Sequence, residues 1–185
     1  MNWLFRVAYE GTSFHGWQRQ PRERTVQGDL ETAMADLFGC DVLADGCSRT
    51  DSGVHALDQC VTVRPPDRPR IPLAGAIKAI NGRLPQDVNI RAGFEQADDF
   101  HARSKSVGKR YTYLLYRGNP QPFLARWCWR QSVRLDIGAM REAIPSLVGT
   151  HDFSSFTVTG GDPGVDPVKT LHRIDLIEHG SIVAI

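Results

Sequence analysis

The chain has 185 residues, of which 41% are hydrophobic and 23% charged, a composition typical of a soluble globular protein with one domain or two small ones. No segment reaches the roughly 18 consecutive apolar residues of a membrane helix, and the first residues do not resemble a signal peptide, so we expect a cytoplasmic protein. The four cysteines include no C-x-x-C pair, so we expect reduced thiols and no metal centre.

The net charge of +1 hides an uneven distribution, because residues 100–134 carry eight basic and no acidic side chains. Aromatic residues are interleaved with these basic ones: Tyr111, Tyr113, Tyr116, Phe123, Trp127 and Trp129. Basic groups attract phosphates and aromatic rings stack on unpaired bases, so one interpretation is an RNA-binding face. The other is a solvated strand face with core aromatics, and this pattern alone leaves both open.

The first half alternates predicted strands and helices. One helix begins after Thr25, whose hydroxyl can cap it, and ends at Gly39. A second helix runs from about Pro72 to Asn81. The predicted strands are Trp3–Glu10, Asp41–Cys47, Leu57–Arg64 and Val88–Phe94. This order, β-α-β-β-α-β, predicts an α+β fold with a ferredoxin-like half and an antiparallel sheet.

The second half begins the same pattern again and predicts an incomplete ferredoxin-like half. We expect strands over Lys109–Arg117, Val168–Glu178 and Ser181–Ile185. Asp136 should cap a helix that Pro145 kinks. Its inward positions are predicted to be Ile137, Met140, Ile144 and Leu147. A further helix and strand would complete the half, so we expect two domains, 1–98 and 99–185, in a chain that is a fragment.

The most suggestive segment for chemistry is the turn-rich loop Cys47–Ala56, which contains Asp51 between two predicted strands. An aspartate is ionised at neutral pH and can act as a nucleophile without an activating base. Arg49 could pair with Asp51 and reach towards a phosphate or base. In the alternative interpretation, Asp51 only shapes the loop as an Asx turn.

This loop and several further segments resemble the tRNA pseudouridine synthase A family. Arg49–Ala56, followed by Gln59, is similar to the family's catalytic motif. Six more segments match in the same order along the chain: Phe14–Gln20, Thr25–Glu31, Asn81–Pro85, Asp99–Arg103, Lys109–Tyr113 and Gly149–Phe156. Ordered matches over most of the chain are far more specific than a single motif.

The resemblance implies cofactor-free isomerisation of uridine to pseudouridine in the anticodon stem and loop of tRNA, by a homodimer and without a metal. It implies that Asp51 is the catalytic aspartate. It also implies that Tyr111 stacks on the everted uracil, although core packing remains the alternative for this ring. Arg49 is implied to help displace the nucleotide. The family's later basic residue lies beyond Ile185, so a non-catalytic tRNA-binding remnant is the second hypothesis. A hydrolase would need another placed carboxylate or a metal site.

Other residues have structural interpretations beside functional ones. His55 is expected to shape the loop by hydrogen bonding, and the dipeptide His151–Asp152 to be structural. For Trp17, lining the RNA cleft and anchoring the loop are equally compatible with the sequence. Two basic clusters could follow the tRNA backbone or lie in solvated loops: Arg19, Arg22 and Arg24, and Arg64, Arg68 and Arg70.

Overall fold

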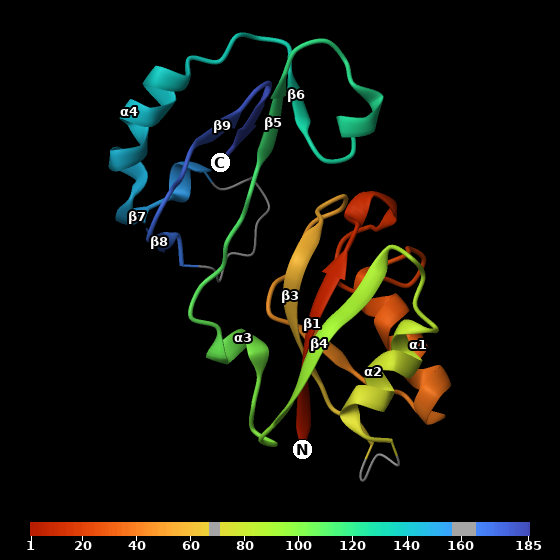
Figure 1. Cartoon of the computed structure of the whole chain (residues 1–185). Helices are drawn as coiled ribbons and strands as arrows, with labels where there is room; N and C mark the ends of the chain where they lie inside the picture. The colour runs from red at the N-terminus through yellow and green to blue at the C-terminus, as the bar shows by residue number, and fades with distance from the viewer. Residues whose placement is uncertain (67–70, 157–165) are drawn as a thin grey trace. The chain divides into compact units, whose positions relative to one another are not determined.

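A computed structural model describes residues 1–66, 71–156 and 166–185, and it divides the chain into two compact units, Met1–Lys109 and Arg110–Ile185 (Figure 1). The segment after residue 98 is tied to the first unit. The Asn2 side-chain amide donates hydrogen bonds to the carbonyl oxygens of Asp98 and Phe100, each at 3.0 Å. The division therefore falls later than the expected boundary after residue 98.

The first unit has the predicted succession of strands and helices. Its elements are β1 (Asn2–Tyr9), η1 (Gly11–Ser13), α1 (Val26–Phe38), β2 (Ala44–Gly46), β3 (Ala56–Val63), α2 (Leu73–Asn81), β4 (Val88–Gln96) and α3 (Ala102–Lys105). The sheet has the order β2-β3-β1-β4, and every neighbouring pair is antiparallel. Figure 1 shows α1 and α2 on the same face of this sheet.

The core of this unit lies between the sheet and the two helices. Alternate residues of β1 point inward and are at most 5% exposed: Trp3, Phe5, Val7 and Tyr9. Helix α1 packs Val26, Leu30 and Met34 against them. The Thr25 hydroxyl accepts a hydrogen bond from the Gly28 N–H at 3.3 Å, and Gly39 ends the helix at a φ of 70°. The predicted cap and stop of α1 are confirmed.

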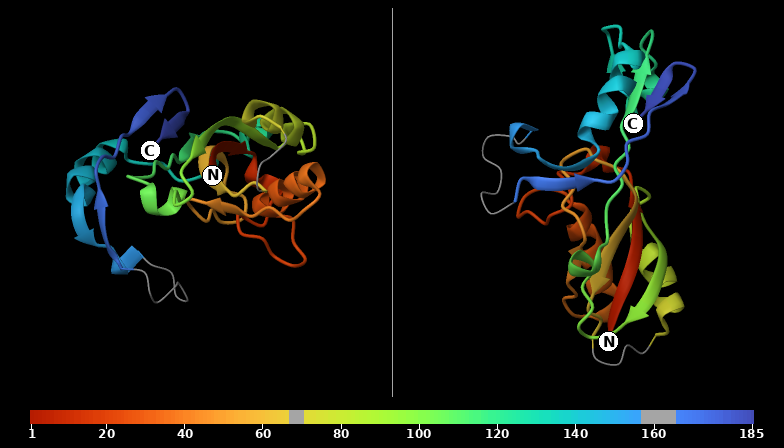
Figure 2. Two further views of the ribbon diagram at one scale, coloured as in Figure 1. Left: turned by 90° about the horizontal axis from the view of Figure 1, so that it is seen from below. Right: turned by 90° about the vertical axis from the view of Figure 1, so that its left-hand side faces the viewer.

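The second unit contains shorter elements. They are β5 (Leu114–Arg117), η2 (Pro122–Leu124), β6 (Trp129–Gln131), α4 (Ile137–Leu147), β7 (Gly149–Asp152), η3 (Ser154–Phe156), β8 (Val168–Leu171), β9 (Ile177–His179) and β10 (Ile182–Ala184). One sheet has the order β6-β5-β10-β9, and β7 pairs with β8 in another. The β9–β10 hairpin, which turns at Gly180, is the blue pair of strands in Figure 2.

Helix α4 agrees with the sequence prediction in its cap and in its inward face. Asp136 Oδ1 accepts a hydrogen bond from the Ala139 N–H at 3.0 Å. The half-buried side chains of the helix are the predicted ones: Ile137, Met140, Ile144 and Leu147. The helix continues through Pro145 to Leu147.

Two strand predictions for this unit were wrong in detail, and one strand was missed. The strand expected from Lys109 begins only at Leu114. The strand expected over Val168–Glu178 is divided into β8 and β9, which belong to different sheets. Strand β6 was not predicted, and it pairs with β5 in parallel, so this sheet is mixed rather than antiparallel. The α+β class is confirmed.

No helix within the described ranges is long and apolar enough to cross a membrane.

Candidate active site

Asp51 lies in the loop between β2 and β3, and its side chain is exposed to solvent. The Val54 N–H donates to the Asp51 carbonyl oxygen at 3.2 Å and closes a turn, in which Gly53 has a φ of 79°. The Asp51 carboxylate makes no hydrogen bond or ion pair with any described residue. The Asx-turn interpretation therefore fails, because the backbone forms this turn without the side chain.

The backbone of this loop is held by the segment Gly11–Trp17. The Trp17 N–H donates to the Thr50 carbonyl oxygen at 3.0 Å, and the Gly53 N–H donates to the Phe14 carbonyl oxygen at 3.3 Å. The Ser52 hydroxyl donates to the same Phe14 oxygen at 3.1 Å. Because Phe14 and Trp17 are themselves 1% and 2% exposed, the loop is fastened to the core on both sides of Asp51.

Two glycines allow this close approach of backbone to backbone. A Cβ atom on Gly16, which has a φ of 86°, would lie 2.7 Å from the Thr50 carbonyl oxygen. A Cβ atom on Gly11 would lie 2.0 Å from the Val54 carbonyl oxygen. Any larger residue at either position would have to move the loop that carries Asp51.

The same segment is joined to the start of α1. The Val26 N–H donates to the Gly16 carbonyl oxygen at 3.3 Å, and the Gln27 N–H donates to the Trp17 carbonyl oxygen at 3.1 Å. The Trp17 ring packs on Gly46, where a Cβ atom would lie 2.5 Å from the indole. Trp17 therefore anchors the loop and does not line an open cleft, which decides between the two interpretations of this residue.

Side chains also brace the loop at three further points. The hydroxyl groups of Tyr9 and Thr50 lie 2.8 Å apart in a hydrogen bond. The Gln59 side-chain amide donates to the Ser48 carbonyl oxygen at 2.5 Å. The Gly11 N–H donates to His55 Nδ1 at 2.9 Å, so this ring nitrogen is an acceptor. His55 thus shapes the loop, as the sequence predicted.

Arg49 is exposed, and the expected pair with Asp51 does not form: no ion pair of Arg49 is found among the described residues. Arg24, from the first basic cluster, has a structural role instead. Its guanidinium binds Asp29 and Asp87 and lies 4.1 Å from the centroid of the Phe14 ring. The hydrogen bond to Asp87 raises the pKa of Arg24 further, and the same bond lowers the pKa of Asp87.

The remaining members of the two clusters divide between paired and unassigned residues. Arg19 binds the buried carboxylate of Glu31 at 2.8 Å. Arg68 and Arg70 lie outside the described residues. Arg22 and Arg64 are exposed and form no ion pair with the described residues.

Tyr111 belongs to the second unit and precedes β5. It is 60% exposed and Tyr113 is 65% exposed, so neither ring is packed in a core. Tyr113 is fixed through its backbone, because its N–H and C=O exchange hydrogen bonds of 2.8 and 3.0 Å with Ile185. The core-packing alternative for Tyr111 therefore fails, and its ring is free to stack on another group.

The dipeptide His151–Asp152 is structural, as expected. His151 Nε2 lies 3.1 Å from the Val148 carbonyl oxygen, and Asp152 Oδ1 accepts from the N–H and the hydroxyl of Ser154 at 2.8 and 2.5 Å. These bonds lower the pKa of Asp152. Within the described part of the chain, no three His, Cys, Asp or Glu side chains gather as metal ligands.

The contacts that hold the Asp51 loop were not apparent in the sequence. The partners Tyr9 and Thr50, and likewise Phe14 and Ser52, lie far apart along the chain. The only sequence signal was the pair of glycines in the polar loop after the first strand, Gly11 and Gly16. A glycine in such a loop has many explanations, so this signal did not identify its partner.

Comparison with known proteins gives a consistent assignment, although no family model matches the chain. A tRNA pseudouridine synthase A from Lacticaseibacillus casei is 41% identical over 174 residues, which are 93% of this chain and 69% of the relative. Proteins of the same name from Bordetella petrii and Aquifex aeolicus are 41% and 38% identical, and cover 94% and 84% of this chain.

The matched region is 65% of the Bordetella petrii protein and 64% of the Aquifex aeolicus protein, so the chain spans about two thirds of the length of these relatives. Identity at this level over nearly the whole chain, together with an exposed aspartate on a firmly held loop, leaves one assignment. The chain belongs to the tRNA pseudouridine synthase A family.

Proposed function

We propose that this chain is the catalytic part of an isomerase that converts uridine to pseudouridine in the anticodon stem and loop of tRNA, with Asp51 as the catalytic carboxylate. The observation that carries this proposal is the exposed Asp51 carboxylate on a loop whose backbone is fixed on both sides. Family membership supports the reaction, since the relatives are named as tRNA pseudouridine synthases.

The reaction breaks the bond between N1 of uracil and C1′ of the ribose and forms a bond between C5 and C1′. All atoms of the base stay in the product, and the proton lost from C5 is balanced by one gained at N1. The Asp51 carboxylate can attack C1′, attack the base, or assist formation of a glycal; each route needs one ionised oxygen close to the everted nucleotide. The held backbone of the loop fixes the point from which the Asp51 side chain extends.

Arg49 and Tyr111 are proposed to hold the displaced nucleotide. The Arg49 guanidinium has no ion-pair partner within the described residues, so its charge is available to a backbone phosphate or to the space left by the base. The Tyr111 ring is 60% exposed, and its face can stack on the uracil. Such contacts offset the few kcal/mol that everting a base requires.

We also propose that the first unit has the ferredoxin-like fold and that the protein works as a cytoplasmic homodimer. The antiparallel order β2-β3-β1-β4 and the succession β-α-β-β-α-β support the fold. The resemblance of the chain to its family supports the dimer, and the mass of the protein in solution tests it.

Mass spectrometry of tRNA from cells that lack the native enzyme tests the reaction. The protein should restore pseudouridine in the anticodon arm, whereas Asp51→Ala and Asp51→Asn should not. Asp41→Asn is the matched control, because Asp41 is also an exposed aspartate of the first unit but lies outside the loop. Product from Asp51→Ala would refute the assignment of Asp51.

A tyrosine series tests the stacking role. Tyr111→Phe should retain binding and reaction because its ring remains, and Tyr111→Ala should lose the reaction. Tyr113→Ala is the control, since Tyr113 is exposed to a similar extent two residues away. If the unaltered protein binds tRNA but forms no product, the non-catalytic remnant is the correct hypothesis.

A further inference from the structure

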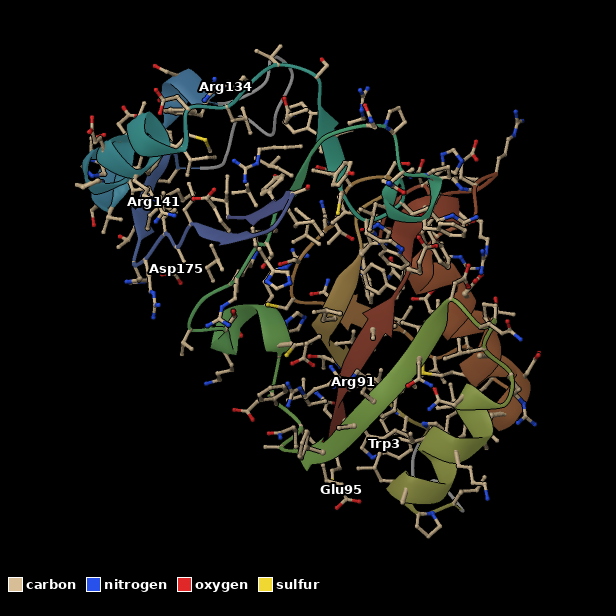
Figure 3. The ribbon with its side chains drawn as sticks, turned by 45° about the horizontal axis from the view of Figure 1, so that its top comes forward. Trp3, Arg91, Glu95, Arg134, Arg141 and Asp175 are labelled. Atoms are coloured by element: carbon tan, nitrogen blue, oxygen red, sulfur yellow. The ribbon has the colours of Figure 1, made fainter. Side chains whose placement is uncertain are left out.

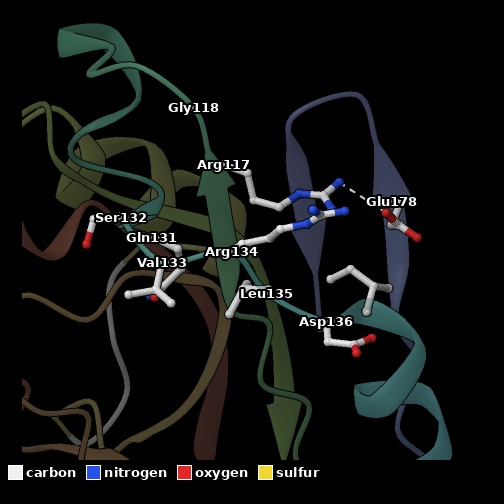
Figure 4. A pocket seen from close by; sticks show the side chains of 10 residues that line it. Arg117, Gly118, Gln131, Ser132, Val133, Arg134, Leu135, Asp136 and Glu178 are labelled. Atoms are coloured by element: carbon white, nitrogen blue, oxygen red, sulfur yellow. Dashed lines mark hydrogen bonds and ion pairs between the residues drawn. The ribbon is translucent and has the colours of Figure 1, made fainter.

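The second unit contains a cavity of about 710 Å³ that the candidate active site does not use. Its walls come from the end of β5, the segment before α4, the first residues of α4, and β9. Figure 4 shows Arg117 reaching into it from β5 and Arg134 from the segment before α4. Cavities of this size accommodate a ligand as large as a nucleotide.

The carboxylates at this cavity are already engaged. The Arg117 guanidinium donates to Glu178 Oε2 at 3.0 Å, and Arg141 donates to Glu178 Oε1 at 3.0 Å, so both oxygens of Glu178 have a partner. Asp136 Oδ1 caps α4 through the Ala139 N–H. The bond from Arg141 keeps the pKa of Glu178 below its ordinary value.

Arg134 also lines this cavity, and it differs from Arg117 in its contacts. Its guanidinium makes no hydrogen bond or ion pair with the described residues, although it lines the cavity. Figure 3 shows Arg134 just before α4 and Arg141 on the helix itself. Two arginines, Arg117 and Arg134, and two carboxylates, Asp136 and Glu178, line the cavity. Glu178 is held by Arg117 and by Arg141, which lies outside the lining, so Arg134 is the lining cation that has no partner among the described residues.

We propose that this cavity binds one phosphodiester of the RNA substrate, with Arg134 as its main contact. A phosphodiester carries a single negative charge, which one unpaired guanidinium can match, and a guanidinium fork suits its two free oxygens. The cavity also lies at the end of the stretch 100–134, which has eight basic and no acidic side chains. This inference rests on the proposed function, because it requires an RNA substrate.

The salt dependence of RNA binding tests the proposal. A fluorescent anticodon-arm hairpin is titrated with Asp51→Ala protein, so that no reaction occurs, between about 0.05 and 0.2 M salt. Because binding weakens with salt, the slope of log K against log salt is negative. Loss of one phosphate contact reduces the magnitude of this slope by about 0.7 to 0.9. Arg134→Gln should show this smaller slope. Its affinity for the hairpin, relative to the protein that keeps Arg134, should therefore recover about threefold from the lowest to the highest salt concentration.

Three further variants make the result specific. Arg134→Lys should keep the slope, because the charge stays. Glu178→Gln should steepen it, because Arg117 and Arg141 lose their shared carboxylate. Arg173→Gln is the matched control in the same unit, because Arg173 already pairs with Asp175 at 2.7 Å; its slope should be unchanged. Circular dichroism of each variant establishes that it is folded.

The outcomes separate this inference from the proposed function. If the Asp51→Ala protein does not bind the hairpin, the proposed function fails. If it binds and Arg134→Gln has the same slope, the phosphodiester site is wrong and the function stands. Inorganic phosphate added at constant ionic strength tests the source of the anion. The side-chain NMR signals of Arg134 report whether phosphate binds there. If phosphate binds and the hairpin does not displace it, the assignment of the site to RNA is wrong.

Discussion

Replacing Gly16 by alanine tests whether the segment Gly11–Trp17 sets the position of Asp51. The new Cβ atom would lie 2.7 Å from the Thr50 carbonyl oxygen, and ordinary contact begins at 3.4 Å, so the two segments must separate by about 0.7 Å. A shift of about 1 Å in a reacting group can lower a rate by about 100-fold. We therefore expect kcat to fall by roughly ten- to a hundredfold, with a smaller change in KM.

The same substitution also destabilises the fold. An alanine at a φ of 86° costs about 1–2 kcal/mol, and weakening the hydrogen bond from Trp17 to Thr50 costs about 1 kcal/mol more. Urea unfolding should therefore show a loss of about 2–3 kcal/mol. The activity is measured as single-turnover pseudouridine formation on an anticodon-arm RNA, without urea and at a temperature at which the variant is folded.

Gly39→Ala is the matched control for Gly16→Ala. Gly39 has a φ of 70°, but no atom lies within 4 Å of its would-be Cβ, and it lies at the end of α1 rather than against the Asp51 loop. It should lose stability to the strain and retain kcat. If Gly16→Ala has the kcat of the unaltered protein, or if Gly39→Ala loses as much activity, the Gly11–Trp17 segment does not position Asp51.

Two other predictions concern stability and thiol reactivity. Asp87→Asn should lower the urea midpoint at neutral pH. Because the pKa of Asp87 is depressed in the folded protein, the advantage of the natural residue is complete above the ordinary carboxyl pKa of about 4. It should decrease below that pH and be lost as the pH falls through the lowered pKa of the folded protein. An equal difference at pH 3 and pH 7 would contradict the Arg24–Asp87 pairing. In Ellman's assay at neutral pH, the exposed Cys40 should react first, whereas Cys60 and Cys128, whose pKa values burial raises, should react slowly; equal rates for all thiols would contradict the described burial.

The first unit was predictable because its signals are local. Thr25 can cap and Gly39 can end a helix whatever the rest of the chain does, and the many apolar residues of Trp3–Tyr9 indicate a strand by themselves. The second unit depends on pairings between distant residues. β6 has three residues, too few for a periodic pattern, and its parallel pairing with β5 follows from the path of the intervening chain. The segment Val168–Glu178 gave no sign that it supplies strands to two sheets.

The sequence suggested the candidate residues of the site, but not the contacts that hold the Asp51 loop. The motif around Asp51 predicts a catalytic carboxylate, and that role stays a prediction; the structure leaves the side chain exposed. The contacts of Gly16 with Thr50 and of Tyr9 with Thr50 bridge separate parts of the chain, and a list of residue types does not contain such distances. Arg49 shows the reverse: closeness in sequence suggested an ion pair with Asp51 that the loop conformation does not form.

Because the Asp51 carboxylate takes no part in holding its own loop, its proposed catalytic role can be tested separately from folding. Removing the carboxylate should leave the thermal melting curve almost unchanged while turnover stops. An inert but natively shaped protein of this kind would be a useful affinity reagent: immobilised on a resin, it would retain the RNAs that it recognises and release them unmodified for sequencing.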